Sequence, residues 1–278
     1  MIPNLSSDGK NQEARQKAIL ELLRQYGTLT LQELADTFSC SLATIRRDLH
    51  DLQAQEPGLR RYHGAVGIEA NAGEQWFADK SAVFTAEKDA IAEVIVRWLP
   101  DHITIGLNGG TTTTRIAWHL AQAQKPVTVV TNAINIAYQL AQANIAVVVI
   151  GGDLRPYNYE TTGTLALDGL ERLHLDWAVL GANGIHSQVG ITTAANEEAV
   201  LGQAFRRAAD QIMIAVDHSK FHRNALYQML EWTDVDYLAT DAQASAWLKE
   251  WPEPPTPVAT DYLGAQIWAW RKTRVGAP

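Results

Sequence analysis

The chain has 278 residues, of which 46% are hydrophobic, with one cysteine and a formal net charge of −8. This composition excludes a disordered chain, an internal disulfide and a cysteine-rich zinc site, and the apolar content suffices for one large and one small domain. The longest apolar run, Ile145 to Ile150, is too short to cross a bilayer and residues 1–11 lack the apolar core of a signal peptide, so we expect a cytoplasmic protein with no membrane partner.

Three short helices are predicted at the start of the chain. Apolar residues recur at helical spacing after Glu13, which predicts the first helix. Thr30 and Glu33 have the spacing of a capping box, which starts a second helix over 31–38. Ser41 is placed to cap a third helix, whose apolar stripe is Ile45, Leu49 and Leu52. Three short helices with a tight turn between the last two are typical of a helix-turn-helix.

The third helix carries residue types that contact DNA. In a helix-turn-helix the first turns of the last helix enter the major groove, so the candidates for base edges and phosphates are Ser41, Thr44, Arg46 and Arg47. Periodicity alone leaves a second interpretation open, in which the helices form a small bundle and the arginines belong to a solvated face. Residues 59–64 predict a short hairpin, a wing whose Arg60 and Arg61 can lie along the DNA backbone, and this favours DNA.

The acidic net charge does not oppose that interpretation. Residues 10–66 contain eight Lys and Arg against seven Asp and Glu, so this segment has a net charge of +1 and the remainder about −9. Four of its arginines form two adjacent pairs, and local clustering determines phosphate affinity more than the overall charge does.

The same segment resembles the DeoR family of transcription regulators. The resemblance rests on Leu34-Ala35, Ser41, Thr44-Ile45-Arg46-Arg47-Asp48-Leu49, Leu52, Arg61 and His63-Gly64-Ala65. It implies a winged helix-turn-helix in which His63 belongs with the arginines among the DNA-binding residues. Cys40 stands where a small aliphatic residue is usual, and we interpret it as a small buried side chain of the turn rather than a redox sensor.

Beyond a polar segment at 67–83 the sequence alternates between helices and strands. Helices are predicted over 85–98, 112–123, 133–143 and 197–209, and strands over 103–107, 127–131, 145–150, 177–181, 212–216, 237–240 and 257–260. This order predicts an α/β fold with a mainly parallel sheet of six or seven strands. The expected parts are a winged helix-turn-helix at 1–66, a linker at 67–84, an effector domain at 85–260 and a C-terminal tail at 261–278.

Small polar residues follow several of the predicted strands. They form five segments, Asn108 to Thr114, Thr131-Asn132, Gly151-Gly152, Gly181 to Gly184 and Asp217 to Lys220. Ligands of open α/β sheets bind beyond the carboxyl ends of the strands, and a glycine-rich turn before a helix offers backbone N–H groups to an anion. The first segment lacks the lysine of a triphosphate-binding loop and the third glycine of a dinucleotide loop, which leaves a small phosphate ester. Each segment alone could also be an ordinary turn.

These five segments resemble the effector domain of the DeoR family, which is similar in fold to sugar-phosphate isomerases and coenzyme A transferases. By this resemblance the phosphate of a sugar phosphate would be held by Gly110, Thr111, Thr112 and Thr113, and the site would be closed by Asp217 and Lys220. The sugar would be surrounded by Asn132, Gly152, Thr162, Gly163 and Asn183. Asn108, a further residue of this site, replaces a common acidic residue, and Gly202 replaces a common Lys or Asn; both departures would affect which sugar fits.

No catalytic set, metal site or cofactor is expected. His218 and His222 have the spacing of a helical metal pair, but no third ligand follows at a diagnostic spacing. Glu197 and Glu198 could reach the pocket, although charged residues at a helix start are usually solvated. We interpret five C-terminal tryptophans as residues of the core or of an interface: Trp232, Trp247, Trp251, Trp268 and Trp270.

The leading hypothesis is a DNA-binding transcriptional repressor of a carbohydrate-metabolism operon. It would bind double-stranded operator DNA as a homodimer or homotetramer and be released by a phosphorylated sugar effector. The alternative is an enzyme, a sugar-phosphate isomerase or deaminase with an appended DNA-binding module, but the sequence shows no dedicated general base beyond Asp217 and Lys220. A third possibility is an activator or architectural DNA binder that ignores sugar phosphates.

Overall fold

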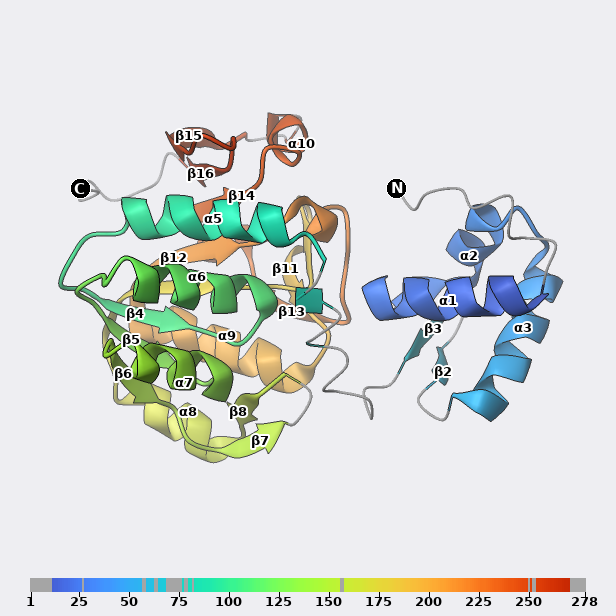
Figure 1. Ribbon diagram of the computed structural model, residues 1–278, viewed down its shortest axis with the longest axis horizontal. Helices are drawn as coiled ribbons and strands as arrows, with labels where there is room; N and C mark the ends of the chain where they lie inside the picture. The colour runs from blue at the N-terminus through green and yellow to red at the C-terminus, as the bar shows by residue number, and fades with distance from the viewer. Residues whose placement is uncertain are drawn as a thin grey trace. The chain divides into compact units, whose positions relative to one another are not determined.

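The computed structural model describes residues 12–26, 28–56, 59–62, 65–68, 77, 80–81, 83–155, 158–249, 251 and 254–270. The chain divides into two compact units, residues 1–83 and 84–278, and each is described by itself (Figure 1). Every helix among the described residues is too short or too polar to span a bilayer.

The smaller unit combines three helices with a three-stranded antiparallel sheet. Its helices are α1 (Gln12–Tyr26), α2 (Leu31–Thr37) and α3 (Leu42–Gln55), and its strands, in the order β1-β3-β2, are β1 (Thr28–Thr30), β3 (Ala65–Ile68) and β2 (Leu59–Tyr62). The three predicted helices are confirmed. The predicted wing is the β2-β3 hairpin, whose turn lies outside the described residues. Strand β1 was not predicted, because three residues are too few to show an alternating pattern.

Side-chain caps start the second and third helices where the sequence places them. The Thr30 hydroxyl accepts a hydrogen bond from the Glu33 N–H at 3.1 Å, and the Glu33 carboxylate accepts one from the Thr30 N–H at 2.7 Å. The predicted capping box is therefore confirmed. Ser41 caps α3 by accepting from the Thr44 N–H at 3.1 Å. Both caps satisfy N–H groups that have no acceptor within their own helix.

A buried ion pair joins α1 to α3. Arg15 donates from two nitrogen atoms to both carboxylate oxygens of Asp48, and the two side chains are only 8% and 1% exposed. Donating to the Asp48 carboxylate raises the pKa of Arg15 above its ordinary value, even though burial opposes this shift. A two-point pair in a dry environment fixes the position of α3 relative to α1.

Replacing Asp48 tests this role. Asp48→Ala is expected to destabilise the smaller unit by about 3–5 kcal/mol, because it leaves the Arg15 cation buried without its carboxylate. Asp51→Ala, which removes a half-exposed carboxylate of the same helix, should cost less than about 1 kcal/mol. Urea unfolding of the full chain, followed by circular dichroism, measures both variants, and equal losses would contradict the assignment.

The larger unit is built on an eight-stranded sheet with the order β15-β16-β14-β12-β9-β4-β5-β6. Its parallel strands are β14 (Tyr237–Thr240), β12 (Ala209–Ala215), β9 (Leu175–Leu180), β4 (Thr104–Leu107), β5 (Thr128–Thr131) and β6 (Ala146–Val149). The hairpin of β15 (Thr256–Thr260) and β16 (Gln266–Ala269) joins β14 in antiparallel pairing. The predicted α/β fold with a mainly parallel sheet is confirmed. The sheet exceeds the predicted six or seven strands because β16 lies in the segment expected to be a tail.

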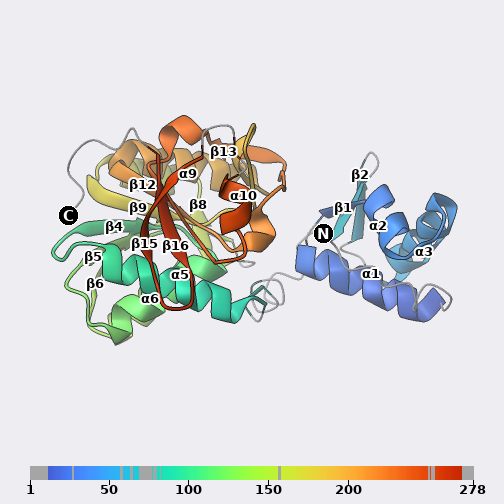
Figure 2. The same cartoon turned by 90° about the horizontal axis from the view of Figure 1, so that it is seen from above.

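Helices cover both faces of this sheet. On one face lie α5 (Thr85–Trp98), α6 (Thr111–Gln122) and α7 (Ile134–Gln142), and on the other lie α8 (Thr164–Glu171) and α9 (Asn196–Ala208) (Figures 1 and 2). The central strands therefore alternate between two cores: Met213 and Ala215 of β12 pack under α5 to α7, and Ile214 packs toward α8 and α9. A sheet buried on both faces leaves the ends of its strands as the place for polar chemistry.

Short elements complete the larger unit. They are β7 (Asp153–Arg155) paired with β8 (Glu160–Thr162), the sheet of β10 (Gly184–His186), β11 (Gly190–Thr193) and β13 (Tyr227–Leu230), and the helix α10 (Ser245–Lys249). Gly202 of α9 packs against β13, because a Cβ atom there would lie 2.3 Å from the Met229 side chain. Its small size is thus a requirement of helix-to-strand packing.

Candidate functional site

The candidate DNA-binding residues of α3 fall into two groups. Ser41 and Thr44 form the capped start of the helix, with their hydroxyl oxygens 2.9 Å apart. Arg46 and Arg47 are exposed, whereas Ile45, which follows Thr44, is fully buried. The helix therefore presents two adjacent cations on the side opposite to its apolar stripe. Arg60 and Arg61 belong to β2, but their side chains and all of His63 lie outside the described residues.

The loop between β4 and α6 presents the start of a helix at the carboxyl end of the sheet. Gly110 precedes the helix with a φ of +151°, a conformation that favours glycine. The Thr113 and Thr114 hydroxyls donate to the Gly110 carbonyl oxygen at 3.1 and 2.7 Å and fix the first turn. Thr111 is partly exposed there, whereas Thr112 is buried. The first N–H groups of α6 have no acceptor within the helix and form a site suited to an anion.

Two predicted ligand residues have structural hydrogen bonds. The Asn108 amide donates to the Gly181 carbonyl oxygen at 3.1 Å, and its oxygen accepts from the Gly181 N–H at 2.8 Å. Asn183 accepts from the Thr193 hydroxyl at 2.8 Å and from the Ala194 N–H at 3.2 Å. Both side chains therefore hold the ends of β4, β9 and β11 in place around the site.

A second group of predicted residues gathers at the end of β5. The buried Asn132 amide donates to the Thr161 carbonyl oxygen at 3.1 Å, while Asn132 Oδ1 has no hydrogen-bond partner among the described residues. Thr162 lies next to Thr161 in β8, and its carbonyl oxygen would lie 2.3 Å from a Cβ atom on Gly152. Gly163 has a φ of +89° and begins α8. Four of the five residues predicted around the sugar thus belong to adjoining segments, with one buried acceptor left over, whereas Asn183 contacts the end of β11 instead.

Asp217 and Lys220 lie in one turn after β12. Asp217 is 1% exposed; its Oδ1 accepts from the Ser219 N–H at 3.0 Å and from the Ser219 hydroxyl, while its Oδ2 has no partner among the described residues. Burial would raise the pKa of Asp217, but Lys220, Ser219 and Lys88 outweigh it and lower that pKa. Burial lowers the pKa of Lys220, and Asp217 opposes this effect. The turn therefore holds a buried carboxylate with an unused acceptor close to a lysine in sequence.

Two buried charged residues were not assigned a role from the sequence. Lys88 of α5 is 3% exposed, and burial lowers its pKa to about 8 although Asp217 opposes the shift. The sequence does contain a signal for its burial. Lys88 lies three residues before Ile91 and seven before Ile95, which puts it on the apolar face of α5. Glu160 of β8 is also 3% exposed, and its Oε1 would lie 2.2 Å from a Cβ atom on Gly109. No local pattern marks Glu160, because its burial depends on a loop far away in the sequence.

Glu198, one of the two glutamates expected near the pocket, takes part in a polar network. Its carboxylate accepts from Arg155 Nη1 at 3.2 Å, from Asn158 Nδ2 at 3.0 Å and from the Thr193 hydroxyl. Asn158 Nδ2 also lies 2.6 Å from Glu160 Oε2, so the network joins β7, β8, β11 and α9. Glu197 is exposed. Glu198 therefore borders the site, whereas Glu197 is a solvated residue of the helix start.

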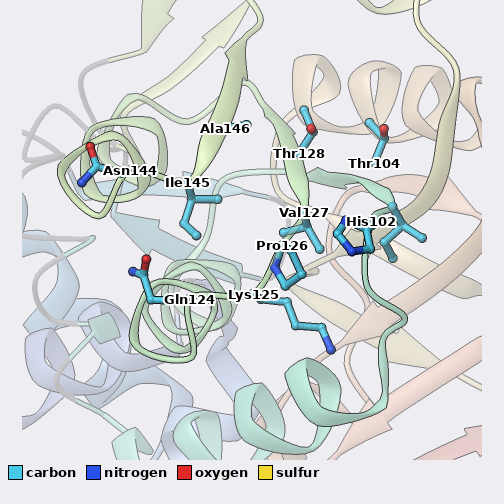
Figure 3. Close-up of a pocket in the computed structure, with 11 residues that line it drawn as sticks. His102, Thr104, Gln124, Lys125, Pro126, Val127, Thr128, Asn144, Ile145 and Ala146 are labelled. Carbon is cyan, nitrogen blue, oxygen red and sulfur yellow. The ribbon is translucent and has the colours of Figure 1, made fainter.

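A cavity of about 470 Å³ lies at the opposite end of the strands (Figure 3). Its lining comes from the starts of β4, β5 and β6 and the segments after α6 and α7, including Thr104, Lys125, Thr128 and Asn144. Helix C-termini carry a partial negative charge, which disfavours an anion there. Lys125 is paired with Asp101 at 2.8 Å. The unused acceptors and the N-terminus of α6 are at the carboxyl ends of the strands, which are therefore better suited to an anionic ligand than this cavity.

The two histidines at metal-pair spacing have different contacts. His218 Nδ1 lies 3.0 Å from Asp241 Oδ2, whereas the exposed His222 ring packs edge-on against Trp247. Among the described residues, no group of three or more His, Cys, Asp and Glu could hold a metal ion. The predicted packing of the C-terminal tryptophans is confirmed for one cluster, with ring centroids 4.7 to 6.1 Å apart in Trp232, Trp251 and Trp270.

Two family models match this chain, one in each unit. The model of the DeoR-like helix-turn-helix domain matches residues 15–71, and that of the DeoR C terminal sensor domain matches residues 83–242. The chain belongs to the DeoR family. This membership makes it a DNA-binding transcriptional repressor rather than an enzyme, and it confirms the resemblance seen in the sequence.

Several DeoR-type relatives are similar over nearly their whole length. The glycerol-3-phosphate regulon repressor of Escherichia coli (strain K12) is 33% identical over 232 residues, which are 83% of this chain and 91% of that protein. The HTH-type transcriptional repressor GlcR of Bacillus subtilis (strain 168) is 30% identical over 231 residues, 83% of this chain and 88% of that protein. Among solved structures, ribose 5 phosphate isomerase A from Neisseria gonorrhoeae has a TM-score of 0.38 at 18% identity, over 66% of this chain and 74% of that chain.

The pKa of Lys88 makes the stability of the sensor unit depend on pH. Because this pKa falls from 10.5 to about 8 on folding, the unfolded chain binds more protons between those two values. The cost of the buried charge, about 3 kcal/mol at most, is therefore present in full below pH 8 and is relieved as the pH rises toward 10.5. Lys88→Met should be more stable than the parent at pH 7, and the difference should shrink between pH 8 and 10.5. Thermal unfolding of both proteins across this range measures it; a constant difference would contradict the assignment.

Proposed function

We propose that this protein represses a carbohydrate-metabolism operon by binding double-stranded operator DNA and that a phosphorylated sugar releases it. The observation that carries the proposal is one chain with an exposed arginine pair on a DeoR-type helix-turn-helix and, at the carboxyl ends of the sheet in its sensor unit, a helix start and two unused buried acceptors. Residues 1–66, 67–84 and 85–260 remain our proposed limits for the DNA-binding, linking and sensing parts, with a tail at 261–278 that includes β16.

The DNA side of the proposal rests on α3 and the wing. The buried apolar stripe of α3 fixes which side of the helix faces solvent, and Arg46 and Arg47 lie on that exposed side. Arginine pairs with guanine edges or with phosphate oxygens, and Ser41 and Thr44 at the helix start are within the part that enters the groove. Arg60, Arg61 and the wing residue His63 are proposed to contact the DNA backbone.

Arg47→Ala is expected to weaken operator binding without unfolding the protein, because its side chain is exposed. The loss of a base contact should cost about 1–3 kcal/mol, and the loss of a phosphate contact should lower the salt slope by about one unit. Arg207→Ala, which removes an exposed arginine from the sensor unit, is the matched control. Gel-shift titrations at several salt concentrations measure both proteins, and identical affinities for the two would exclude this surface.

The ligand side rests on groups that a phosphorylated sugar would complete. Free N–H groups at the start of α6, with Gly110, Thr111, Thr112 and Thr113, suit a phosphate. Asn132 Oδ1 and Asp217 Oδ2 are buried acceptors that sugar hydroxyls can satisfy. Lys220 supplies a cation, and the remaining candidates frame the site: Asn108, Gly152, Thr162, Gly163 and Asn183. The glycerol-3-phosphate regulon repressor among the relatives makes glycerol 3-phosphate part of any ligand panel.

Thr111→Glu should abolish release while sparing both the fold and operator binding. A carboxylate at the first residue of α6 is favourable for the helix but puts the wrong charge where the phosphate binds. The panel is glycerol 3-phosphate and several hexose and pentose phosphates, and the parent should lose operator affinity about 5- to 150-fold with one of them. Thr256→Glu, on the exposed start of β15, is the control and should behave as the parent. Release of Thr111→Glu at the parent's ligand concentration would show that the phosphate binds elsewhere.

We also propose that the protein acts in the cytoplasm as a homodimer or homotetramer. DNA-binding heads of this kind occupy two half-sites about one helical turn or more apart, which requires at least two copies. The ligand must bind the DNA-bound and DNA-free arrangements with different affinities, because equal affinity would shift neither population.

A further inference from the structure

We propose that strand β6 and the exposed side of α7 form the surface through which two copies of this chain associate. The two β6 strands would pair antiparallel about Val148, so that the sensor units share one continuous sheet across a two-fold axis perpendicular to it. This inference rests on the proposed function in one respect, since a repressor that occupies two half-sites needs at least two copies. The surface and the register follow from features of the sensor unit alone.

Strand β6 is an open edge of the eight-stranded sheet. Among the described strands it pairs with β5 alone, and its Val148 and Val149 are 41% and 45% exposed. The Ile150 N–H donates to the Thr131 carbonyl oxygen of β5 at 2.8 Å. Because the backbone groups of alternate residues point to opposite sides of a strand, those of Val147 and Val149 point away from β5. An apolar strand with outward-pointing backbone groups is a template for pairing with another strand.

The opposite edge of the sheet is protected against such pairing, whereas β6 is not. Edge strands avoid association through proline, bulges and charged side chains. Strand β15 carries Pro257, which has no N–H to donate, and its pairing with β16 is irregular between Pro257 and Ala259. Strand β6 consists of one alanine and three valines, and its pairing with β5 is regular. The unprotected edge therefore indicates a strand that is covered in the functional assembly.

The segment that contains this edge carries no charge. Residues 126–152, which include β5, α7 and β6, contain no Lys, Arg, Asp, Glu or His, although 19% of the residues in the whole chain are charged. Helix α7 is the outermost of the three helices on its face and lies next to β6 (Figure 1). Its Ile134 and Tyr138 are 40% and 68% exposed and lie one turn apart. Because the cores of interfaces are depleted of charged residues, this surface suits contact with another protein.

A second copy of the chain is the occupant that fits both features. A two-fold contact brings each surface against itself, and in a chain with a net charge of −8 an uncharged surface can do so without like-charge repulsion. With Val148 on the axis, the outward groups of Val147 in one copy face those of Val149 in the other and can exchange hydrogen bonds in both directions. An axis perpendicular to the sheet keeps its faces unchanged, so the two α7 helices would meet on one face, beside the joined strands.

Sedimentation equilibrium of the full chain tests the surface. Val148→Lys places a charge at the centre of the strand contact, and Tyr138→Glu places one on α7. Both side chains are exposed, so the fold should persist, and circular dichroism checks this. Each variant should associate at least about tenfold more weakly than the parent and reach half its mass on dilution. The controls are Val258→Lys and Tyr262→Glu, which make the same changes to exposed residues in and beside β15 and should keep the parent's mass.

A disulfide cross-link tests the register. Cys40 is the single cysteine of the chain, so Cys40→Ala provides a background without thiols. In this background Val148→Cys should form a covalent dimer on mild oxidation, because opposed residues at a position without hydrogen bonds have Cα atoms about 4.5 Å apart, within reach of a disulfide. Val258→Cys in the same background should stay monomeric on a non-reducing gel. If Val148→Cys associates as the parent does but forms no cross-link, the register is wrong.

The outcomes separate this inference from the proposed function. If Val148→Lys and Tyr138→Glu both keep the parent's mass, the interface lies elsewhere, even where the parent binds operator DNA and the function stands. Loss of association in one variant alone would limit the interface to the strand or to the helix that it alters. A monomeric parent would mean that a different chain, or none, covers this edge, and it would overturn the second copy as the occupant. Association lost in both variants of a parent that binds no operator would support the interface and overturn the function.

Discussion

The pairing of the Asn108 side chain with both backbone groups of Gly181 holds the centre of the sensor unit together. It joins the carboxyl ends of β4 and β9, and the loops that follow these strands carry the start of α6 on one side and the segment at 181–184 on the other. A carboxylate at this position could accept from the Gly181 N–H but could not donate to its carbonyl oxygen. The amide therefore makes a pair of hydrogen bonds that an acidic residue could not complete, and it places no negative charge beside the loop that we propose binds the phosphate.

The boundaries of helices could be predicted from the sequence where they depend on neighbouring residues. The capping box at Thr30, the Ser41 cap and the apolar periodicity of α5 depend on residues within one or two turns, and they were predicted correctly. Strand β16 and the β7-β8 hairpin were not predicted, because their pairing partners lie elsewhere in the chain and their own residues show no clear alternation. The role of Asn108 was predicted as ligand binding, but its two hydrogen bonds reach a residue 73 positions away, which no local pattern reveals.

The two buried sets of charged side chains differ in how completely their hydrogen-bonding groups are satisfied. Between Arg15 and Asp48 the donors and acceptors match, and the pair is complete. Around Asp217 they do not match, because Oδ1 accepts two hydrogen bonds from Ser219 while Oδ2 is buried without a partner among the described residues. Incomplete satisfaction of buried charge lowers the free energy of unfolding and is expected where a ligand completes the arrangement. By this criterion the smaller unit carries a structural ion pair, and the unsatisfied carboxylate of the sensor unit supports the binding site that we propose there.

The turn at 217–220 also contacts Phe84, the first residue of the sensor unit. Phe84 has a φ of +53°, which is costly for a non-glycine residue and persists only when its surroundings hold it. The ring contact with His218 supplies part of that support, and the His218 ring is held in turn by Asp241. His218 directly follows Asp217 in the turn at 217–220, so this turn and the first residue of the unit share one packing contact. Tightly packed contacts shift together rather than bend gradually. The ring contact therefore links the turn at 217–220 to the strained backbone at Phe84.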